Sequence, residues 1–238
     1  MTTVALIGPD GAGKSTVIRH VLDELPVPVR SIYMGVNLEA SRLMLPTTRL
    51  ALEVKRRRGG RPDMVGSGAA PDGRRGPLRE IRSGLRLANW IAEEWFRQGV
   101  AWYHERRGRV VLFDRHFLLD YYANDVLGKR PGRPWTSRLH GRMLERWFPR
   151  PDLVIFLDAP AELLFARKGE STVEALEQKR REFLALQTVF RGFHVIDATQ
   201  DRDAVVRDVI ATIVAALHPP SPARPTPSAD PDLQETAA

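Results

Sequence analysis

The feature that most constrains this chain is a glycine-rich segment, Gly8-Pro-Asp-Gly-Ala-Gly-Lys-Ser-Thr16, between an apolar run and a helical pattern. It matches G-x-x-x-x-G-K-[ST], the pattern of a phosphate-binding loop that joins a strand to a helix. The glycines let backbone N–H groups turn inward towards phosphate oxygens, and the helix N-terminus adds positive partial charge. The segment therefore predicts a P-loop; the alternative is a strand-to-helix turn that binds nothing.

Within this loop we expect different residues to have different roles. Lys14 should bridge the β- and γ-phosphates of ATP, and Ser15 should supply its hydroxyl to Mg²⁺. GTP is disfavoured, because the only asparagine after position 100, Asn124, precedes Asp125 and not the lysine of a guanine-reading Asn-Lys-x-Asp motif. The other residues expected to line the phosphate site are Gly8, Asp10, Gly11, Ala12, Gly13 and Thr16.

Five short, mostly β-branched apolar runs alternate with helical patterns along the chain. Most runs are continuously apolar, which is typical of strands buried on both faces of a parallel sheet. The clearest helical stripe lies between Val205 and Leu217. This alternation predicts an α/β protein with the three-layer P-loop NTPase fold, a five-stranded parallel sheet with helices on both faces. The predicted strands are Val4–Gly8, Val29–Met34, Arg109–Asp114, Leu153–Asp158 and Phe193–Asp197.

Composition divides the 238 residues into a domain, an insertion and a tail. Residues 1–217 carry the strand–helix pattern and are predicted to form a single P-loop kinase domain. A basic insertion occupies about residues 37–78, and its part from 55 to 78 is rich in Gly, Pro and Arg, which predicts a mobile loop. Residues 218–238 are Pro-rich and predict a disordered tail.

The positive charge of the chain is concentrated in one stretch. Residues 37–87 contain 12 Lys/Arg and 5 Asp/Glu, which accounts for the whole net charge of +7. Such a stretch favours contact with phosphates of a substrate, a nucleic acid or an anionic surface; alternatively, its arginines only solvate a loop. The absence of cysteine excludes disulfides, and with no apolar run of about 18 residues and no leader pattern we expect a cytoplasmic protein.

The third predicted strand ends in Asp114-Arg115-His116. Ligands of open α/β sheets bind beyond the carboxyl ends of the strands, so the first two side chains should face the phosphates. Asp114 would hold Mg²⁺ through water, and the planar guanidinium of Arg115 would clamp the acceptor. The alternative for this pair is a surface ion pair at a strand end. His116 would either touch the substrate or pack and cap a helix.

A second cationic segment, Ala166-Arg-Lys-Gly-Glu170, lies on a short connection between two helical patterns. It suits a lid that closes over ATP and brings Arg167 or Lys168 to the charge of the transferring phosphoryl group. The alternative is that both are C-terminal cations of a helix, favoured by the helix dipole, with Gly169 as the cap.

In this order, the motifs resemble the thymidylate kinase family of P-loop nucleoside-monophosphate kinases. Residues 8–16 are similar to its phosphate loop, residues 114–116 to its Asp-Arg-Tyr/His motif, and residues 151–158 to the strand before its lid. The similarity runs from about Thr3 to Gly35 and from about Leu85 to Leu217. The resemblance implies an ATP and Mg²⁺ requirement, and homodimers are frequent in the family.

The resemblance also implies roles for single residues. Arg115 would bind the acceptor phosphate, and the loop from Asp197 to Gln200 would lie near the adenine. Gly11 stands where some members carry a catalytic arginine, and members without it supply the arginine from the lid, which assigns that role to Arg167. The predicted catalytic residues are Lys14, Asp114, Arg115 and Arg167, with Ser15 and Asp114 as metal ligands.

The acceptor half departs from the family pattern. The place of a Thr-Arg-Glu-Pro-like segment reads Tyr33-Met-Gly-Val-Asn37, and that of an Ala-Asp-Arg reads Ala88-Asn-Trp90. A phosphate acceptor is favoured, because no carboxylate ends the second strand to deprotonate a hydroxyl; Glu39 is the nearest. We therefore predict an ATP-dependent nucleoside-monophosphate kinase, with dTMP as the first acceptor. Two alternatives stay open: a kinase of a nucleoside, sugar or other small molecule, and a non-catalytic ATP-dependent binding module with a basic docking loop.

Overall fold

A five-stranded parallel sheet forms the centre of the protein in the computed structural model, which describes residues 2–35, 43–57, 59, 77–121, 134–169 and 171–218. The strand order is β2-β3-β1-β4-β5. All four strand pairs are parallel. The predicted fold class is confirmed, and each strand boundary lies within one residue of its prediction. The strands are β1 Thr3–Ile7, β2 Val29–Tyr33, β3 Val110–Asp114, β4 Leu153–Asp158 and β5 Phe193–Asp197.

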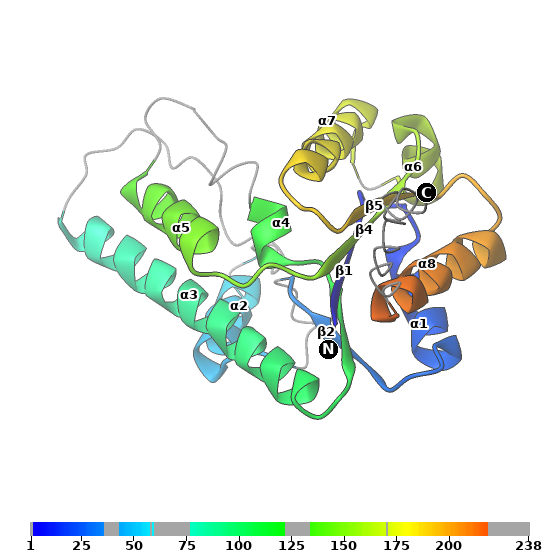
Figure 1. The fold of residues 1–238 in the computed structure, drawn as a ribbon. Coiled ribbons are helices and arrows are strands. Elements are labelled where there is room, and N and C mark those ends of the chain that lie inside the picture. Colours follow the sequence, from blue (N-terminus) through cyan, green and yellow to red (C-terminus); the bar gives the residue numbers. More distant parts are fainter. Residues whose placement is uncertain are drawn as a thin grey trace, which may run out of the picture.

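Helices cover both faces of the sheet, as Figure 1 shows. Helices α1 and α8 pack on one face, and α3, α4 and α5 pack on the other. The described helices are α1 Lys14–Glu24, α2 Pro46–Arg57, α3 Pro77–Glu105, α4 Phe117–Tyr121, α5 Trp135–Arg146, α6 Ala161–Lys168, α7 Val173–Leu184 and α8 Arg202–Leu217. None of the helices in these described ranges is long and apolar enough to cross a membrane.

The central strands explain why the apolar runs are continuous. In β1, Val4 and Leu6 belong to the core under α1 and α8, whereas Ala5 and Ile7 belong to the core under α3 and α5. Successive side chains of a strand point to opposite faces, so a strand covered on both sides needs apolar residues at every position. The side chains of β3 and β4 alternate in the same way. Because β1 pairs in parallel with both of these strands, the carboxyl ends of all three lie at the same edge of the sheet.

Two local predictions need correction. Residues 55–57 are the last turn of α2, and residues 77 and 78 begin α3, so both ends of the predicted loop are helical. In the sequence, Ser171-Thr-Val-Glu174 matches the capping-box pattern, which predicts Ser171 as the N-cap of the helix that follows, α7. The observed cap is Thr172, whose hydroxyl accepts a hydrogen bond from the Ala175 N–H at 3.2 Å. Most of the basic insertion and residues 219–238 of the predicted tail lie outside the described residues.

Candidate active site

The glycine-rich loop joins β1 to α1 and depends on its glycines. Gly11 and Gly13 have φ angles of 89° and 87°, in the left-handed region that side chains disfavour. A Cβ atom on Gly11 would also lie 2.5 Å from the Leu164 carbonyl oxygen of α6. The loop therefore runs against α6 so closely that only glycine fits at position 11. Its last residue, Gly13, is the N-cap of α1, so the N-terminus of that helix opens onto the loop.

Lys14 is held inside this loop. Its side chain is largely buried, with 9% of the residue exposed. The ammonium donates hydrogen bonds to the carbonyl oxygens of Gly8, at 2.7 Å, and Pro9, at 2.8 Å. Ser15 follows it, exposed in the first turn of α1. A buried cation, an exposed hydroxyl and a helix N-terminus at one place fit a bound triphosphate with its metal.

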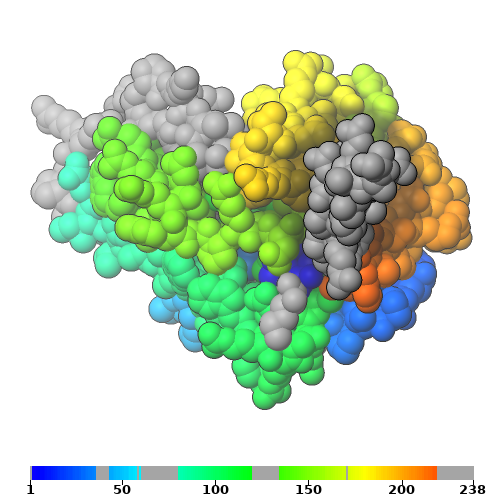
Figure 2. Space-filling view, viewed as in Figure 1, coloured from blue at the N-terminus to red at the C-terminus, as the bar shows by residue number. Residues whose placement is uncertain are grey.

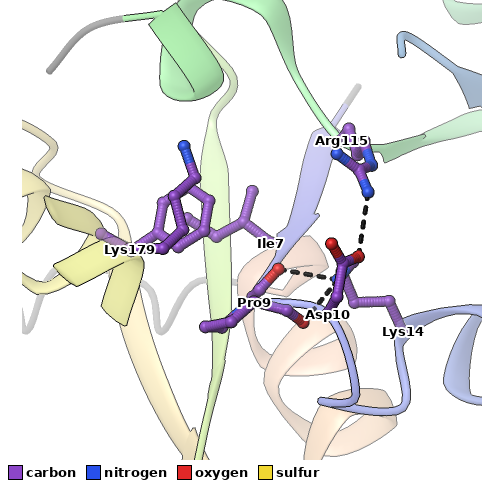
Figure 3. A pocket seen from close by; sticks show the side chains of 8 residues that line it. Ile7, Pro9, Asp10, Lys14, Arg115 and Lys179 are labelled. Atoms are coloured by element: carbon purple, nitrogen blue, oxygen red, sulfur yellow. Dashed lines mark hydrogen bonds and ion pairs between the residues drawn. The ribbon is translucent and has the colours of Figure 1, made fainter. Parts of the chain in front are cut away.

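Arg115 reaches across from the end of β3 to the loop. Its backbone has a φ of 64°, rare for a residue with a side chain, and this turns the chain away from the strand after Asp114. The guanidinium donates to the Asp10 carboxylate at 3.1 Å, as Figure 3 shows. Asp114 is half-buried, and its pairing with Leu6 puts it at the carboxyl edge of the sheet. The two predicted site regions, the loop and the Asp-Arg motif, therefore meet.

His116 packs in the core. Its ring lies edge-to-face against Phe113, at 4.9 Å between centroids, and against Phe148, at 5.6 Å. Burial lowers the pKa of His116 to about 3, because the surrounding apolar side chains disfavour the charged imidazolium. Of the two roles open to it from the sequence, packing is the observed one, and the ring is neutral near pH 7.

The predicted lid segment is the end of α6, and its two cations point to different places. Gly169 adopts a φ of 66° and caps the helix, so Arg167 and Lys168 are cations of its last turn. Arg167 donates to the Ala198 carbonyl oxygen at 3.0 Å, within the loop expected near the adenine. The Lys168 ammonium lies 3.9 Å from the Asp10 carboxylate. In this arrangement Lys168, and not Arg167, lies beside the phosphate loop.

Three residues of α7 at or near the candidate site were not predicted from the sequence. Lys179 and Phe183 line a small pocket together with Gly8, Pro9, Asp10, Lys14 and Arg115 (Figure 3). Arg180 forms a two-pronged contact with Asp158 at the end of β4, at 2.6 and 2.9 Å. The Asp158 carboxylate, with a smaller contribution from Glu177, raises the pKa of Arg180 above its already high value. In the sequence, the basic run Lys179-Arg-Arg181, soon after the predicted lid segment, is the feature that could have indicated these residues.

A buried ion pair holds the segment after β2. Arg97 of α3 is fully buried and lies 2.7 Å from the Glu93 carboxylate. Its guanidinium also donates to the carbonyl oxygens of Tyr33, at 3.0 Å, and Gly35, at 2.6 Å. Glu93 in turn accepts from the Leu45 N–H at 2.9 Å, just before α2. Tyr33 to Gly35, the described part of the stretch that departs from the family pattern, is thus fixed to α3 by a charged network that the sequence did not reveal.

The other departure, Ala88-Asn-Trp90, faces neighbouring helices. Asn89 donates to the Thr48 hydroxyl at 2.8 Å and accepts from the Thr47 hydroxyl, so it ties α3 to the start of α2. The Trp90 ring lies 5.3 Å from the ring of His140 on α5. His140 and Glu94 form a buried pair at 2.9 Å between α5 and α3. These contacts assign Asn89 and Trp90 a packing environment between α2, α3 and α5.

Comparison with known proteins finds similarity to thymidylate kinases. The chain is 36% identical to a thymidylate kinase of Xanthomonas campestris over 47% of this chain and 48% of that protein, and 35% identical to one of Xanthomonas oryzae over the same shares. The resemblance to the thymidylate kinase family is confirmed. A probable thymidylate kinase of Saccharolobus solfataricus is 27% identical over 44% of this chain and 54% of that protein. The chain spans about half the length of the curated thymidylate kinases it matches, and no protein-family model matches it.

Proposed function

We propose that residues 1–217 form a kinase domain that transfers the γ-phosphoryl group of ATP to a nucleoside monophosphate, with dTMP as the first acceptor. One observation carries this proposal: Arg115 of the Asp-Arg motif lies against Asp10 of the phosphate loop, so cations of both face one pocket. A donor phosphate at the loop and an acceptor phosphate at Arg115 would then be neighbours. The similarity to thymidylate kinases supports the same reaction.

The reaction needs positioning and neutralisation of charge more than a strong base. An oxygen of the acceptor phosphate, already ionised at neutral pH, would attack the γ-phosphorus while the bond to the β–γ bridging oxygen breaks and ADP leaves. Lys14 would exchange its carbonyl partners for phosphate oxygens, and Arg115 would hold the acceptor. When bound with ATP, Mg²⁺ would neutralise the phosphate charge, with Ser15 and Asp114 as its ligands. Arg167 or Lys168 would neutralise the transferring group.

The test is ADP release from Mg·ATP with dTMP, the other nucleoside monophosphates, thymidine and a few sugars. Acceptor-dependent release with one monophosphate, lost in Lys14→Met, is expected. Release with thymidine or a sugar instead would favour the alternative of a kinase for another small molecule. ATP binding with no acceptor-dependent release would leave the non-catalytic binding module. The predicted contact of residues 37–87 with a nucleic acid or anionic surface, and the cytoplasmic location, stay predictions.

We also propose that the protein forms a homodimer through α3. One face of this helix is exposed and carries apolar or small residues, with Leu85 66% exposed and Tyr103 50% exposed. Their spacing of 4-3-4-4-3-4 residues keeps them on one side of the helix. The stripe consists of Ile81, Leu85, Ala88, Ala92, Phe96, Gly99 and Tyr103.

The stripe is complementary to itself about Ala92. If two copies of α3 crossed in antiparallel at this residue, Leu85 would face Gly99 and Phe96 would face Ala88. A two-fold interface pairs residue i of one copy with residue j of the other and j with i. Near the crossing point each large side chain therefore meets a small one, and at the ends of the stripe Ile81 would face Tyr103. The size pattern therefore favours a second copy of the chain over an unrelated partner.

Light scattering after gel filtration tests the dimer. We expect the wild type to have twice the mass of the chain and Ala92→Arg to be a folded monomer. Ala211→Arg is the matched control, because Ala211 is an exposed alanine on α8, away from the stripe. A monomeric wild type would contradict the proposal, as would an Ala92→Arg variant that stays dimeric.

A further inference from the structure

Helix α7 contributes a cation to the phosphate-loop pocket. Lys179 and Phe183 are separated by four residues, so they lie on one face of the helix, and both line the pocket beyond β1. Figure 3 shows Lys179 and Arg115 on opposite sides of the space above Ile7 and Pro9. Phe183 is buried against Phe156, at 5.7 Å between ring centroids, which anchors this face of α7 on the sheet.

Arg180 fixes the orientation of this helix. Its two hydrogen bonds to Asp158 join α7 to the carboxyl end of β4, the strand beside β1. A guanidinium held at two points restricts rotation of the helix about its axis more than a single contact would. Lys179, the preceding residue, is therefore presented to the pocket by a defined anchor and not by a loosely attached helix.

The pocket carries an excess of positive charge. Among the residues that the structure describes, three cationic side chains line it, Lys14, Arg115 and Lys179, against one carboxylate, Asp10. Asp10 is already engaged by Arg115 at 3.1 Å and approached by Lys168 at 3.9 Å. The Lys179 ammonium lies 3.8 Å from the Glu182 carboxylate and 4.7 Å from the Phe183 ring centroid, and its side chain is 35% exposed. A concave surface with this imbalance attracts an anion.

The position of the pocket indicates which anion it would bind. Its lining includes Pro9, Asp10 and Arg115 but none of residues 197–200, the loop expected near the adenine. Lys179 therefore lies on the side of the phosphate loop that Arg115 occupies. We propose that Lys179 binds the phosphate of the acceptor together with Arg115, and so selects acceptors that carry a phosphate monoester over neutral alcohols. This inference rests on the proposed phosphotransfer and names the chemical class of its acceptor.

The test compares Lys179→Met with Arg181→Met. Both variants remove one positive charge from α7, but Arg181 is 75% exposed and points to Glu177, outside the pocket lining. The dissociation constant of dTMP is measured by calorimetry in the presence of Mg·ADP, and KM and kcat are measured where turnover occurs. Loss of a charge-assisted hydrogen bond should raise the dissociation constant and KM for dTMP about tenfold or more in Lys179→Met.

Further readouts separate substrate binding from a general loss of structure. In Lys179→Met, kcat and the affinity for Mg·ADP should change by less than about threefold, because the donor site is left intact. Lys179→Arg, which keeps the charge, should retain most of the affinity. Thymidine, which lacks the phosphate, should bind the wild type and Lys179→Met equally, and Arg181→Met should behave as the wild type.

Each other outcome has a distinct meaning. Equal dTMP affinity of Lys179→Met and the wild type would overturn the Lys179 site, and so would an equal loss in Arg181→Met. A wild type that binds Mg·ADP but none of the nucleoside monophosphates would overturn it as well. Binding of dTMP that depends on Lys179, without any transfer, would uphold the site and overturn the proposed kinase activity.

Discussion

Two regions of the molecule are held in place in different ways: the phosphate loop, called the phosphate-loop side below, and the segment after β2 that α3 holds, called the α3 side. The phosphate-loop side depends on short-range backbone geometry, with Gly11 and Gly13 in left-handed conformations and Lys14 bonded to carbonyls five and six residues before it. The α3 side depends on contacts between residues distant in sequence, such as Arg97 with Tyr33 and Gly35. The first kind of site is encoded in nine consecutive residues, whereas the second exists only after the fold has formed.

Breaking the α3 side should have the largest effect on stability. Arg97→Met leaves the buried Glu93 carboxylate without its cation and two carbonyl groups without a donor, and we expect it to lower the free energy of unfolding by about 3–5 kcal/mol. Urea denaturation measures this change. Arg86→Met is the matched control on the exposed side of α3, with an expected change below about 0.5 kcal/mol. A loss of less than about 1 kcal/mol in Arg97→Met would mean that this network does not hold the segment after β2.

Two glycine substitutions test whether the phosphate loop packs against α6. Gly11→Ala and Gly13→Ala both place an alanine at positive φ, which costs about 1–2 kcal/mol. Only at position 11 would the new Cβ also meet the Leu164 carbonyl oxygen, whereas nothing lies within 4 Å of it at position 13. We therefore expect Gly11→Ala to cost about 1–3 kcal/mol more and to weaken ATP binding further. Equal effects of the two changes would show that the loop does not rest on α6.

His116 packs in the core directly after Arg115 and makes the stability of the protein depend on pH. Its pKa is lowered to about 3 in the folded protein, below the ordinary value of about 6.5 in the unfolded chain. Between these values the unfolded state binds more protons, so this contribution to stability is present above pH 6.5 and is lost as the pH falls. Urea denaturation should show that the free energy of unfolding falls by about 2 kcal/mol from pH 6.5 to pH 5.0 because of this group. The His116→Leu variant should lack this decrease. An identical pH slope in the variant would contradict the neutral buried ring.

The smallest effect is expected where α2 meets α3. Asn89→Ala removes the hydrogen bonds to Thr47 and Thr48, and each is worth about 0.5–1.5 kcal/mol. A double-mutant cycle with Thr48→Val should give a coupling energy of about 0.5–1 kcal/mol in urea denaturation. A coupling energy near zero would show that Asn89 and Thr48 do not interact.

The sequence predicted what local rules determine. Strands buried on both faces need unbroken apolar runs, and the glycine pattern permits only a few backbone paths, so the sheet and the contents of the phosphate loop could be predicted. The contacts of the charged side chains on α3 and α7 could not be predicted from the sequence. Glu93 and Arg97 are four residues apart, a spacing that also occurs on solvent-exposed helix faces, so the sequence does not show that this pair is buried. The orientation of α7, which places Lys179 at the pocket, depends on the contact of Arg180 with Asp158, 22 residues earlier.

The end of α6 shows the same limit. The residues Arg167 and Lys168 both suit a lid, and sequence alone cannot say which of two adjacent side chains turns towards the phosphate loop. The choice depends on the Ala198 carbonyl, which becomes a partner of Arg167 only when β5 joins the sheet beside β4. The sequence therefore indicated the segment as a candidate, and the packing of distant strands determines where the side chains of Arg167 and Lys168 lie.

Phosphorus NMR of the protein with Mg·ATP and dTMP tests the central claim most directly, because it identifies the product and not only the loss of ATP. The account predicts that dTDP and ADP accumulate one for one in the wild type and that neither forms with Lys14→Met. Accumulation of ADP with inorganic phosphate while dTMP stays unchanged would contradict transfer to this acceptor. Unchanged ATP and dTMP in the wild type would contradict it as well.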